Sequence, residues 1–200
     1  AEAQAAYAVG YAELFSLITW TSVGLMGAAG AVAGQNLGAG HPDRTMRAVQ
    51  IAAQIGLGVA ACVSAMFLLI PEQLLAIFGL KDPIVVDLGK QLLRYLSVSG
   101  FFITVALTYT GGLQGTGDTR SPLYITLASQ IVVPIGLCSL FQATRGLQAG
   151  DIWFAILLGH LTRALLSFAR FRQERWRHIA VDIEPLPVVT VRVNSGDEVT

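Results

Sequence analysis

Charged residues are scarce in this chain. Only 13% of its 200 residues are Asp, Glu, Lys or Arg, against about 25% in ordinary soluble domains, while 54% are hydrophobic. Thirteen basic residues balance thirteen acidic ones, so the formal net charge is zero and no basic surface indicates a nucleic-acid partner. A composition this apolar excludes an ordinary soluble domain.

Residues for metal, disulfide or phosphate chemistry are also few. The two cysteines, Cys62 and Cys138, each lie in an apolar run, where a thiol packs as a small hydrophobic group. No two Asp residues lie within four positions of each other, and no His or Cys pattern has metal-ligand spacing. A membrane-embedded transferase would need Asp clusters to hold a metal-bound diphosphate. We therefore expect no enzymatic activity and no cofactor.

Long uncharged runs are what the sequence has in abundance. A helix of about 20 apolar residues crosses the roughly 30 Å hydrocarbon core of a bilayer with its backbone amides bonded internally. Five runs meet or approach that length, and the expected spans are residues 7–37, 49–70, 93–115, 121–143 and 152–172. The predicted fold is all-α, a polytopic membrane helical bundle of about five transmembrane helices.

The segments between and after these runs add three predictions. Pro134, near the middle of the fourth run, predicts a kink because it removes one backbone hydrogen bond. Residues 72–94 mix charges with apolar residues at helical spacing, which indicates an interfacial segment leading into the third helix. Residues 179–200 are predicted to form a disordered tail.

The distribution of Lys and Arg predicts the orientation. Seven lie in loops on one side, Arg44, Arg47, Arg120, Arg170, Arg172, Arg175 and Arg177, against four on the other, Lys81, Lys90, Arg94 and Arg145. Positively charged loops stay in the cytoplasm. The C-terminus, and with it the tail, is therefore expected in the cytoplasm.

Two similar glycine-rich segments end the first and third runs: residues 34–44 read GQNLGAGHPDR and residues 112–120 read GLQGTGDTR. Glycines let the backbone leave a helix and let neighbours approach, while Asp and Arg beyond them can cap helix ends and pair with each other within a short loop. The repetition suggests internal duplication, which transporters often show, although two plain helix stops would read the same way. The loop residues singled out are Gly34, Gln35, Gly38, Gly40, Gln114, Gly115, Gly117, Asp118 and Arg120.

These segments and others in the same order resemble the multidrug and toxic compound extrusion (MATE) family. The other elements are Phe78, Asp82 with Pro83, Tyr95 with Leu96, Ser121 with Pro122, and residues 150–155 and 170–176. The resemblance covers residues 5–178 and implies one of two pseudo-symmetric lobes of six helices. It implies that residues 1–178 are most of the C-terminal lobe without its first helix. The chain has no initiator Met and no signal peptide, so we expect it to begin inside a longer protein, whose N-terminal lobe would be its partner.

The resemblance also implies a function for the parent protein. Family members sit in membranes, here expected to be the bacterial plasma (inner) membrane, and export small cationic or amphipathic drugs or metabolites in exchange for protons or sodium by alternating access. In several members the C-terminal lobe holds a cation through carboxylates, yet residues 95–117 contain no Asp or Glu, so the N-terminal lobe is expected to carry the coupling ion. A lipid-linked oligosaccharide flippase and a non-transporting membrane interaction protein are the alternatives. The flippase would need a strongly cationic cavity, for which only Arg163 is present.

Few ionisable residues lie within the runs, and each costs about 2.5 to 3.5 kcal/mol at the centre of a helix if charged. Glu13 would bind a cation or exchange a proton, or else cap the helix at the interface. Arg163, with His160 one turn earlier on the same face, would face the lobe interior or a wet cavity, or would snorkel to the cytoplasmic interface. His160 would relay protons along the ion pathway, or simply pack between helices. Tyr109 would line a drug cavity through cation-π contact, or simply pack between helices.

Overall fold

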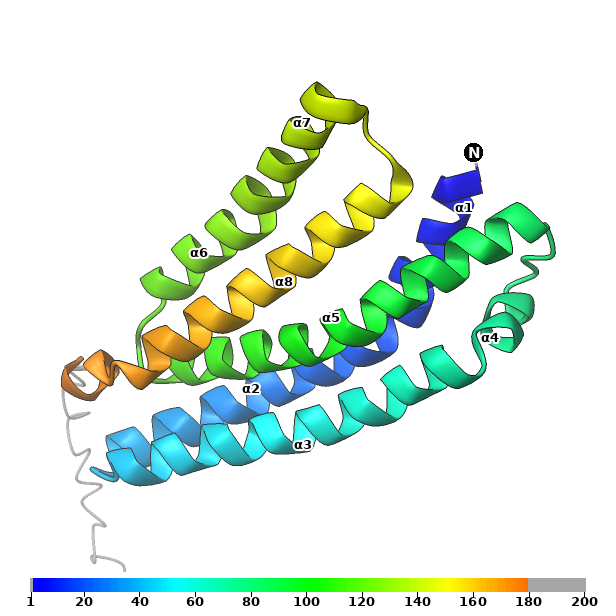
Figure 1. The fold of residues 1–200 in the computed structure, drawn as a ribbon. Helices are drawn as coiled ribbons and strands as arrows, with labels where there is room; N and C mark the ends of the chain where they lie inside the picture. Colours follow the sequence, from blue (N-terminus) through cyan, green and yellow to red (C-terminus); the bar gives the residue numbers. More distant parts are fainter. Residues whose placement is uncertain (1, 180–200) are drawn as a thin grey trace, which may run out of the picture.

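Five helical spans make up the part of the chain that the computed structural model describes, residues 2–179. The predicted tail, from residue 180 onward, lies outside the described residues. The elements, in chain order, are α1 (Glu2–Tyr7), η1 (Ala8–Leu14), α2 (Ser16–Gly38), α3 (Pro42–Leu69), α4 (Pro71–Ile77), α5 (Pro83–Gly115), α6 (Arg120–Leu127), η2 (Ala128–Val132), α7 (Val133–Arg145), α8 (Ala149–Arg172) and η3 (Arg175–His178). The predicted all-α membrane bundle is confirmed (Figure 1).

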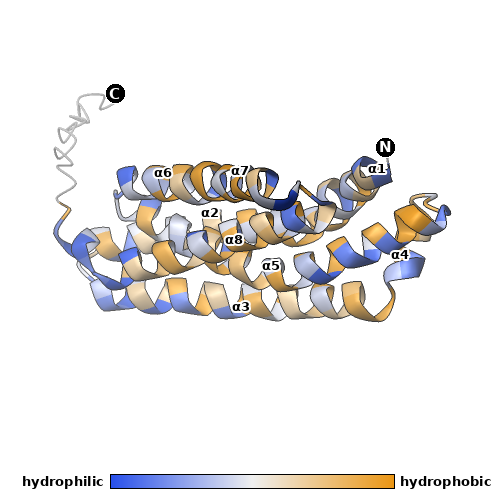
Figure 2. Cartoon of the chain, turned by 45° about the horizontal axis from the view of Figure 1, so that its top comes forward, coloured by the Kyte–Doolittle hydropathy of each residue, from blue (hydrophilic) through white to orange (hydrophobic). Residues whose placement is uncertain are grey.

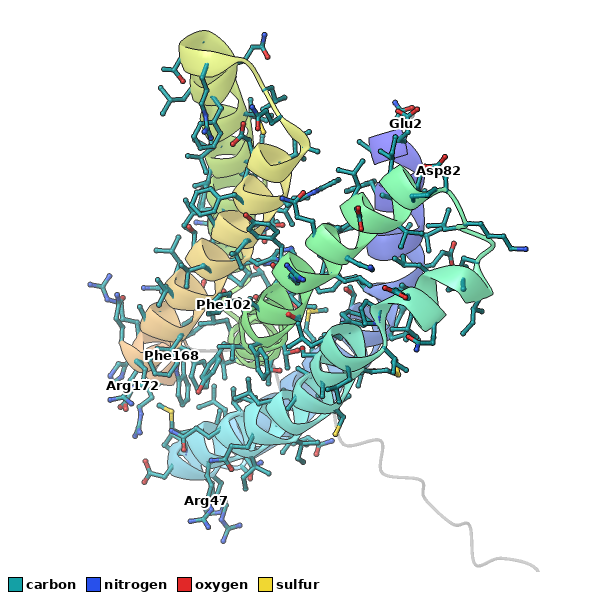
Figure 3. All side chains as sticks on the ribbon, turned by 45° about the vertical axis from the view of Figure 1, so that its right-hand side comes forward. Glu2, Arg47, Asp82, Phe102, Phe168 and Arg172 are labelled. Atoms are coloured by element: carbon teal, nitrogen blue, oxygen red, sulfur yellow. The ribbon has the colours of Figure 1, made fainter. Side chains whose placement is uncertain are left out.

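Hydropathy is arranged as a bilayer requires. Hydrophilic residues gather toward the two ends of the bundle, and hydrophobic turns follow the middle of each long helix (Figure 2). At one end Glu2 and Asp82 extend outward, and at the other end Arg47 and Arg172 do (Figure 3). We call the second end the motif end, because it carries the loops 39–41 and 116–119 and the chain that follows α8.

Several helices begin earlier than the apolar runs predict. The structure starts α3 at Pro42 rather than at residue 49, and α5 at Pro83 rather than at residue 93. Both begin with proline, whose missing N–H costs nothing in a first helical turn. The Asp82 carboxylate caps α5 by accepting hydrogen bonds from the first turn, at 2.9 and 3.2 Å. Charged turns therefore extend helices beyond their apolar spans.

The predicted interfacial segment, residues 72–94, divides into the short helix α4 and the charged first turns of α5. The Lys90 ammonium lies 2.5 Å from a Glu72 carboxylate oxygen, which joins the two helices. This hydrogen bond from Lys90 lowers the pKa of Glu72. The ion pair thus fixes α4 to the start of α5 at the end of the bundle opposite the motif end.

The helix α5 lies at the centre of the fold. In an 18-residue stretch of α5, 78% of the residues are buried, against 6% in the span formed by α6, η2 and α7. The helices α2, α3 and α8 all pack on α5, while α6 and α7 lie along α8 (Figure 1). The α6–α7 arm therefore presents most of its side chains to the surroundings of the chain.

Glycines bring α2 and α5 into backbone contact. A Cβ built on Gly111 would lie 2.1 Å from the Met26 carbonyl oxygen, and one on Gly115 would lie 2.0 Å from the carbonyl oxygen of Gly30. Only glycine permits this approach. A buried hydrogen bond of 2.9 Å between the hydroxyls of Ser22 and Thr104 joins the same two helices.

Two spans contain π-helical turns that the sequence analysis did not predict. In the fourth span, η2 immediately precedes the turn that holds Pro134. Pro134 has no N–H to continue the α-helical hydrogen-bond pattern. The wider π-helical turn before it accommodates this missing hydrogen bond. In the first span, η1 is closed by the Phe15 amide, which donates to the Gly10 carbonyl at 3.0 Å.

Candidate functional site

The two glycine-rich segments meet at the motif end. Each leaves its helix through a glycine with positive φ, 76° at Gly40 and 90° at Gly117, a conformation that side-chain-bearing residues rarely adopt. The Thr116 hydroxyl donates to the Gly112 and Leu113 carbonyls, at 3.0 and 2.9 Å, and so tightens the last turn of α5. Each turn is followed closely by an Asp: Asp118 at the end of the second loop and Asp43 in the first turn of α3.

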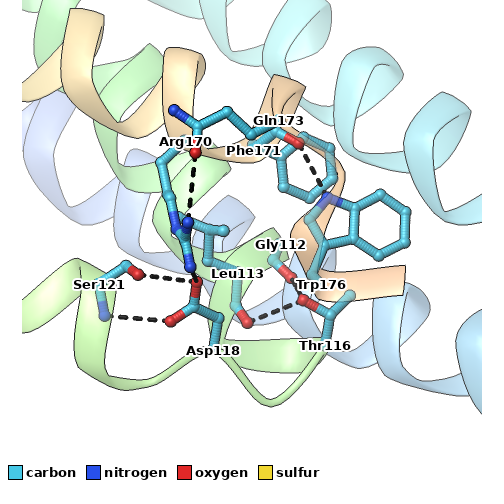
Figure 4. Close-up of polar contacts among 9 residues, drawn as sticks. All are labelled: Gly112, Leu113, Thr116, Asp118, Ser121, Arg170, Phe171, Gln173 and Trp176. Carbon is cyan, nitrogen blue, oxygen red and sulfur yellow. Dashed lines mark hydrogen bonds and ion pairs between the residues drawn. The ribbon is translucent and has the colours of Figure 1, made fainter. Parts of the chain in front are cut away.

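Asp118 is held by residues from two elements (Figure 4). Its carboxylate accepts the backbone N–H and the hydroxyl of Ser121, at 3.1 and 2.8 Å. The Arg170 guanidinium of α8 contacts the same carboxylate at 2.9 and 3.0 Å. Burial alone would raise the pKa of Asp118, but the Ser121 hydrogen bonds and the Arg170 charge outweigh it and lower the pKa. Asp118 is therefore ionised and ties α6 and α8 together.

The other motif Asp is paired in a similar way. Arg177, in η3, reaches the Asp43 carboxylate at 2.9 Å. The chain turns back to make this contact because the Trp176 indole N–H donates to the Phe171 carbonyl at 2.9 Å, and the two rings stack with centroids 5.1 Å apart (Figure 4). We call Asp43, Asp118, Arg170, Trp176 and Arg177 the clasp.

The clasp corrects one prediction. The sequence predicts that each motif Asp pairs with the Arg of its own loop, but both pair with arginines from the chain at or after the end of α8. These partners are 52 and 134 residues away in the sequence, so only the folded bundle brings them together. The predicted capping role is confirmed for Asp118, which bonds the first turn of α6.

A second group of side chains lies in the half of the bundle away from the motif end. The rings of Tyr7, Tyr11 and Phe15 follow one another, one turn apart, along α1, η1 and the residue after η1. Tyr7 stacks on Tyr11 with centroids 5.0 Å apart, and the Phe15 ring is tilted against Tyr11 at 5.4 Å. The Tyr7 ring lies 5.9 Å from Trp153, and the Phe15 ring lies 5.7 Å from His160. We call the rings of Tyr7, Tyr11 and Phe15 the aromatic column. This column covers one face of α8.

Of the four predicted pathway residues, the structure brings two together beside this column. His160 is 2% exposed and stacks on Phe15, and Arg163 lies one turn further along α8. The Arg163 side chain is half-buried; its Nε is enclosed without a hydrogen-bond partner among the described residues, and none of their carboxylates forms an ion pair with it.

The other two predicted residues lie elsewhere. Tyr109 is buried nearer the motif end, edge-on to Phe168 and Phe171 at 5.2 and 5.4 Å. Its ring therefore packs α5 against the end of α8, where Trp176 of the clasp stacks on Phe171. Phe102 precedes Tyr109 on α5 and lies on the side of this helix that faces α8 (Figure 3). Glu13 is exposed on η1, where its carbonyl accepts the Ser16 hydroxyl at 2.5 Å, and it takes no part in the aromatic column.

His160 and Arg163 belong to a set of polar groups that share one property, and the other members of the set do not stand out in the sequence. Each has a buried side-chain atom with no hydrogen-bond partner among the described residues, and those on α8 are Trp153, His160, Arg163 and Ser167. Their spacing of seven, three and four residues puts them on one face of α8. That spacing was the signal available in the sequence.

This face of α8 meets a pocket where the helix begins. The pocket has a volume of about 280 Å³ and is lined by Ala3, Gln4, Tyr7, Ile152 and Trp153. The unpartnered indole N–H belongs to one of these lining residues. The polar face and the aromatic column therefore both begin at this pocket.

Comparisons with known proteins agree on the kind of protein. The family model MatE matches residues 1–140. The chain is 30% identical over 157 residues to a probable multidrug resistance protein NorM of Deinococcus radiodurans, covering 74% of this chain and 34% of that protein. It is 31% identical over 156 residues to the multidrug resistance protein PmpM of Pseudomonas aeruginosa, covering 73% and 31%. A probable NorM of Thermotoga maritima is 26% identical over 183 residues, covering 90% and 39%. The chain thus spans about a third of the length of these relatives.

Proposed function

Because this chain belongs to the MatE family, we propose that the protein of which it forms part exports drugs or metabolites across a membrane in exchange for protons or sodium. The observation that carries the proposal is the family match over residues 1–140, which falls on four of the five membrane-length helices. The relatives that the chain matches are described as multidrug resistance proteins. We place the protein in a bacterial inner membrane, with the motif end in the cytoplasm.

The geometry supports a division of roles within the chain. The clasp and the glycine contacts between α2 and α5 hold the helices as one body, which suits a lobe that rocks against a partner lobe. The aromatic column supplies faces for an amphipathic or cationic substrate. In the central stretch of α5, residues 95–115, there is no Asp or Glu, so we assign the coupling ion to the segment of the protein beyond this chain.

The experiment is dye retention by living cells. A strain lacking its own drug pumps would express the full-length transporter that contains this segment, and ethidium fluorescence would be followed after loading. We expect faster loss of dye than from cells with the empty vector, and a loss that stops when a protonophore collapses the proton gradient or when sodium is withdrawn. Equal dye retention in both strains would contradict the proposal.

A further inference from the structure

A groove lies between α5 and α8 in the half of the bundle away from the motif end. It has a volume of about 400 Å³ and is lined by Gln91, Arg94, Tyr95 and Val98 of α5 and by Leu157 of α8. The spacing of three, one and three residues places the four α5 side chains on one face of that helix. None of the lining residues belongs to the clasp or to the aromatic column.

Three polar side chains gather at the outer end of this groove. Gln91 and Arg94 are exposed, and Tyr95 is half-buried. The amide nitrogen of Gln91 lies beside the start of α8, since a Cβ built on Gly150 would be 3.4 Å from it. The guanidinium, the amide nitrogen and the phenol hydroxyl can all donate hydrogen bonds, so this end of the groove suits an acceptor.

Arg94 adds a positive charge that the described residues leave unpaired. Two other cations at this end of the bundle have carboxylate partners, Lys90 in Glu72 and Arg145 in Asp151. None of the carboxylates among residues 2–179 forms an ion pair with Arg94. A guanidinium presents its donors as a planar fork that matches the oxygen atoms of a phosphate. The acceptor that fits this end of the groove is therefore an anionic oxygen group.

The sequence of α5 gives the depth of these groups in a bilayer. Arg94 is the last charged residue before an uncharged stretch that continues from Tyr95 to the end of the helix at Gly115. Charged side chains and tyrosines at such a boundary lie at the level of the lipid headgroups. The polar end of the groove is thus at the membrane interface opposite the motif end.

Apolar residues continue the groove toward the bilayer centre. Val98 is 46% exposed, and Leu157 forms the facing wall from α8. Phe102, one turn beyond Val98, lies on the side of α5 that faces α8 (Figure 3). A soluble anion would pair with Arg94 but would leave this apolar surface uncovered. A phospholipid has the same order of groups as the groove, with a phosphate at the interface and acyl chains below it.

We propose that this groove binds a phospholipid of the leaflet opposite the motif end. Arg94 binds the phosphate oxygens, and Gln91 and Tyr95 donate hydrogen bonds to the same headgroup. One acyl chain lies over Val98 and Leu157. The lipid thereby joins α5 to α8 on their outer side, and the proposal does not depend on what the protein transports.

The test is lipid binding to the full-length transporter that contains this segment. The delipidated protein in detergent would be titrated with phosphatidylglycerol and with the diacylglycerol that has the same acyl chains and no phosphate, and native mass spectrometry would count the bound molecules. At the tightest site, wild-type protein is expected to bind the phospholipid at least about tenfold more tightly than the diacylglycerol, because the charge-assisted hydrogen bonds need the phosphate. Equal affinity for both lipids would overturn the proposal.

Substitutions of one residue then locate the contact. Arg94→Gln is expected to hold one phospholipid fewer than wild type at the same lipid concentration, whereas Arg94→Lys retains part of the binding because it keeps the charge. The control is Lys81→Gln, which removes an exposed positive charge in the loop before α5, outside the groove, and is expected to bind as wild type does. Thermal unfolding of each variant checks that the protein is folded. Unchanged binding in Arg94→Gln, or an equal loss in Arg94→Gln and Lys81→Gln, would overturn the proposal.

A last arm distinguishes a lipid from a soluble phosphate. Glycerophosphoglycerol has the headgroup of phosphatidylglycerol without its chains, and it is expected to displace the bound lipid only at a concentration at least about a hundredfold higher, since each buried methylene contributes about 0.8 kcal/mol. Displacement at equal concentration would show that the groove holds a soluble phosphate and that the proposal is wrong.

Discussion

Arg170 and Asp118 are 52 residues apart in the sequence, yet two guanidinium nitrogens of Arg170 contact one carboxylate oxygen of Asp118, at 2.9 and 3.0 Å. The pair joins the last turn of α8 to the loop between α5 and α6 (Figure 4). Since α8 packs on α5, the pair closes the bundle at the motif end. The contribution of this ion pair can therefore be measured as a change in the stability of the whole bundle.

Removal of the Asp118 carboxylate is expected to lower the melting temperature of the protein. Asp118→Asn loses the charge that holds Arg170 and Ser121, and hydrogen bonds to charged groups contribute about 1.5 to 3 kcal/mol. Thermal unfolding in detergent measures the effect, with Asp87→Asn as the control because Asp87 is exposed and has only a 3.8 Å contact with Lys90. In a double-mutant cycle, Arg170→Gln added to Asp118→Asn should cost little more; full additivity would show that the two do not interact.

The same substitution predicts a pH dependence. The pKa of Asp118 is lowered in the folded protein, so its contribution is present above the unfolded value of about 3.9 and is lost as pH falls through the folded value. The difference in melting temperature between wild type and Asp118→Asn should be constant at neutral pH and shrink below about pH 4. A difference that persists unchanged well below that pH would mean that the carboxylate is not the group responsible.

The contact between α2 and α5 predicts that single methyl groups are poorly tolerated. Gly115→Ala would place Cβ 2.0 Å from the Gly30 carbonyl oxygen, and the helices must separate. We expect a loss of about 1 to 3 kcal/mol or more, seen as a lower melting temperature or as loss of folded protein.

Gly27→Ala, on α2, is the matched control, since nothing lies within 4 Å of its Cβ position. It is expected to leave stability unchanged or to raise it by about 0.5 to 1 kcal/mol through helix propensity. Equal behaviour of the two variants would show that the helices do not pack as described.

The sequence predicts the existence of the spans because several uncharged runs, each long enough to cross a bilayer, are typical of membrane helices and rare in soluble domains. It does not predict where α5 begins, since the turns around Asp87 and Lys90 are charged and only the Asp82 cap shows that the helix continues through them. Nor does it predict the partners of Asp43 and Asp118, which depend on how α8 and η3 return to the motif loops.

The candidate site can be predicted only in part. His160 and Arg163 stand out because ionisable residues are rare in membrane spans. Trp153 and Ser167 do not, because an interfacial Trp and a Ser are ordinary in such helices and only their shared spacing with His160 links them. Glu13 lies apart from these residues because of the way η1 is rotated. The π-helical turn changes this rotation, and a helical wheel with α-helical spacing does not capture it.

Transport in a purified system tests the central claim most directly. The full-length transporter that contains this segment would be reconstituted in liposomes loaded with a cationic dye, and efflux would be followed after a proton or a sodium gradient is imposed, with protein-free liposomes alongside. The account predicts that one of the two gradients drives dye out against its own concentration difference. Dye loss at the protein-free rate under both gradients would contradict it.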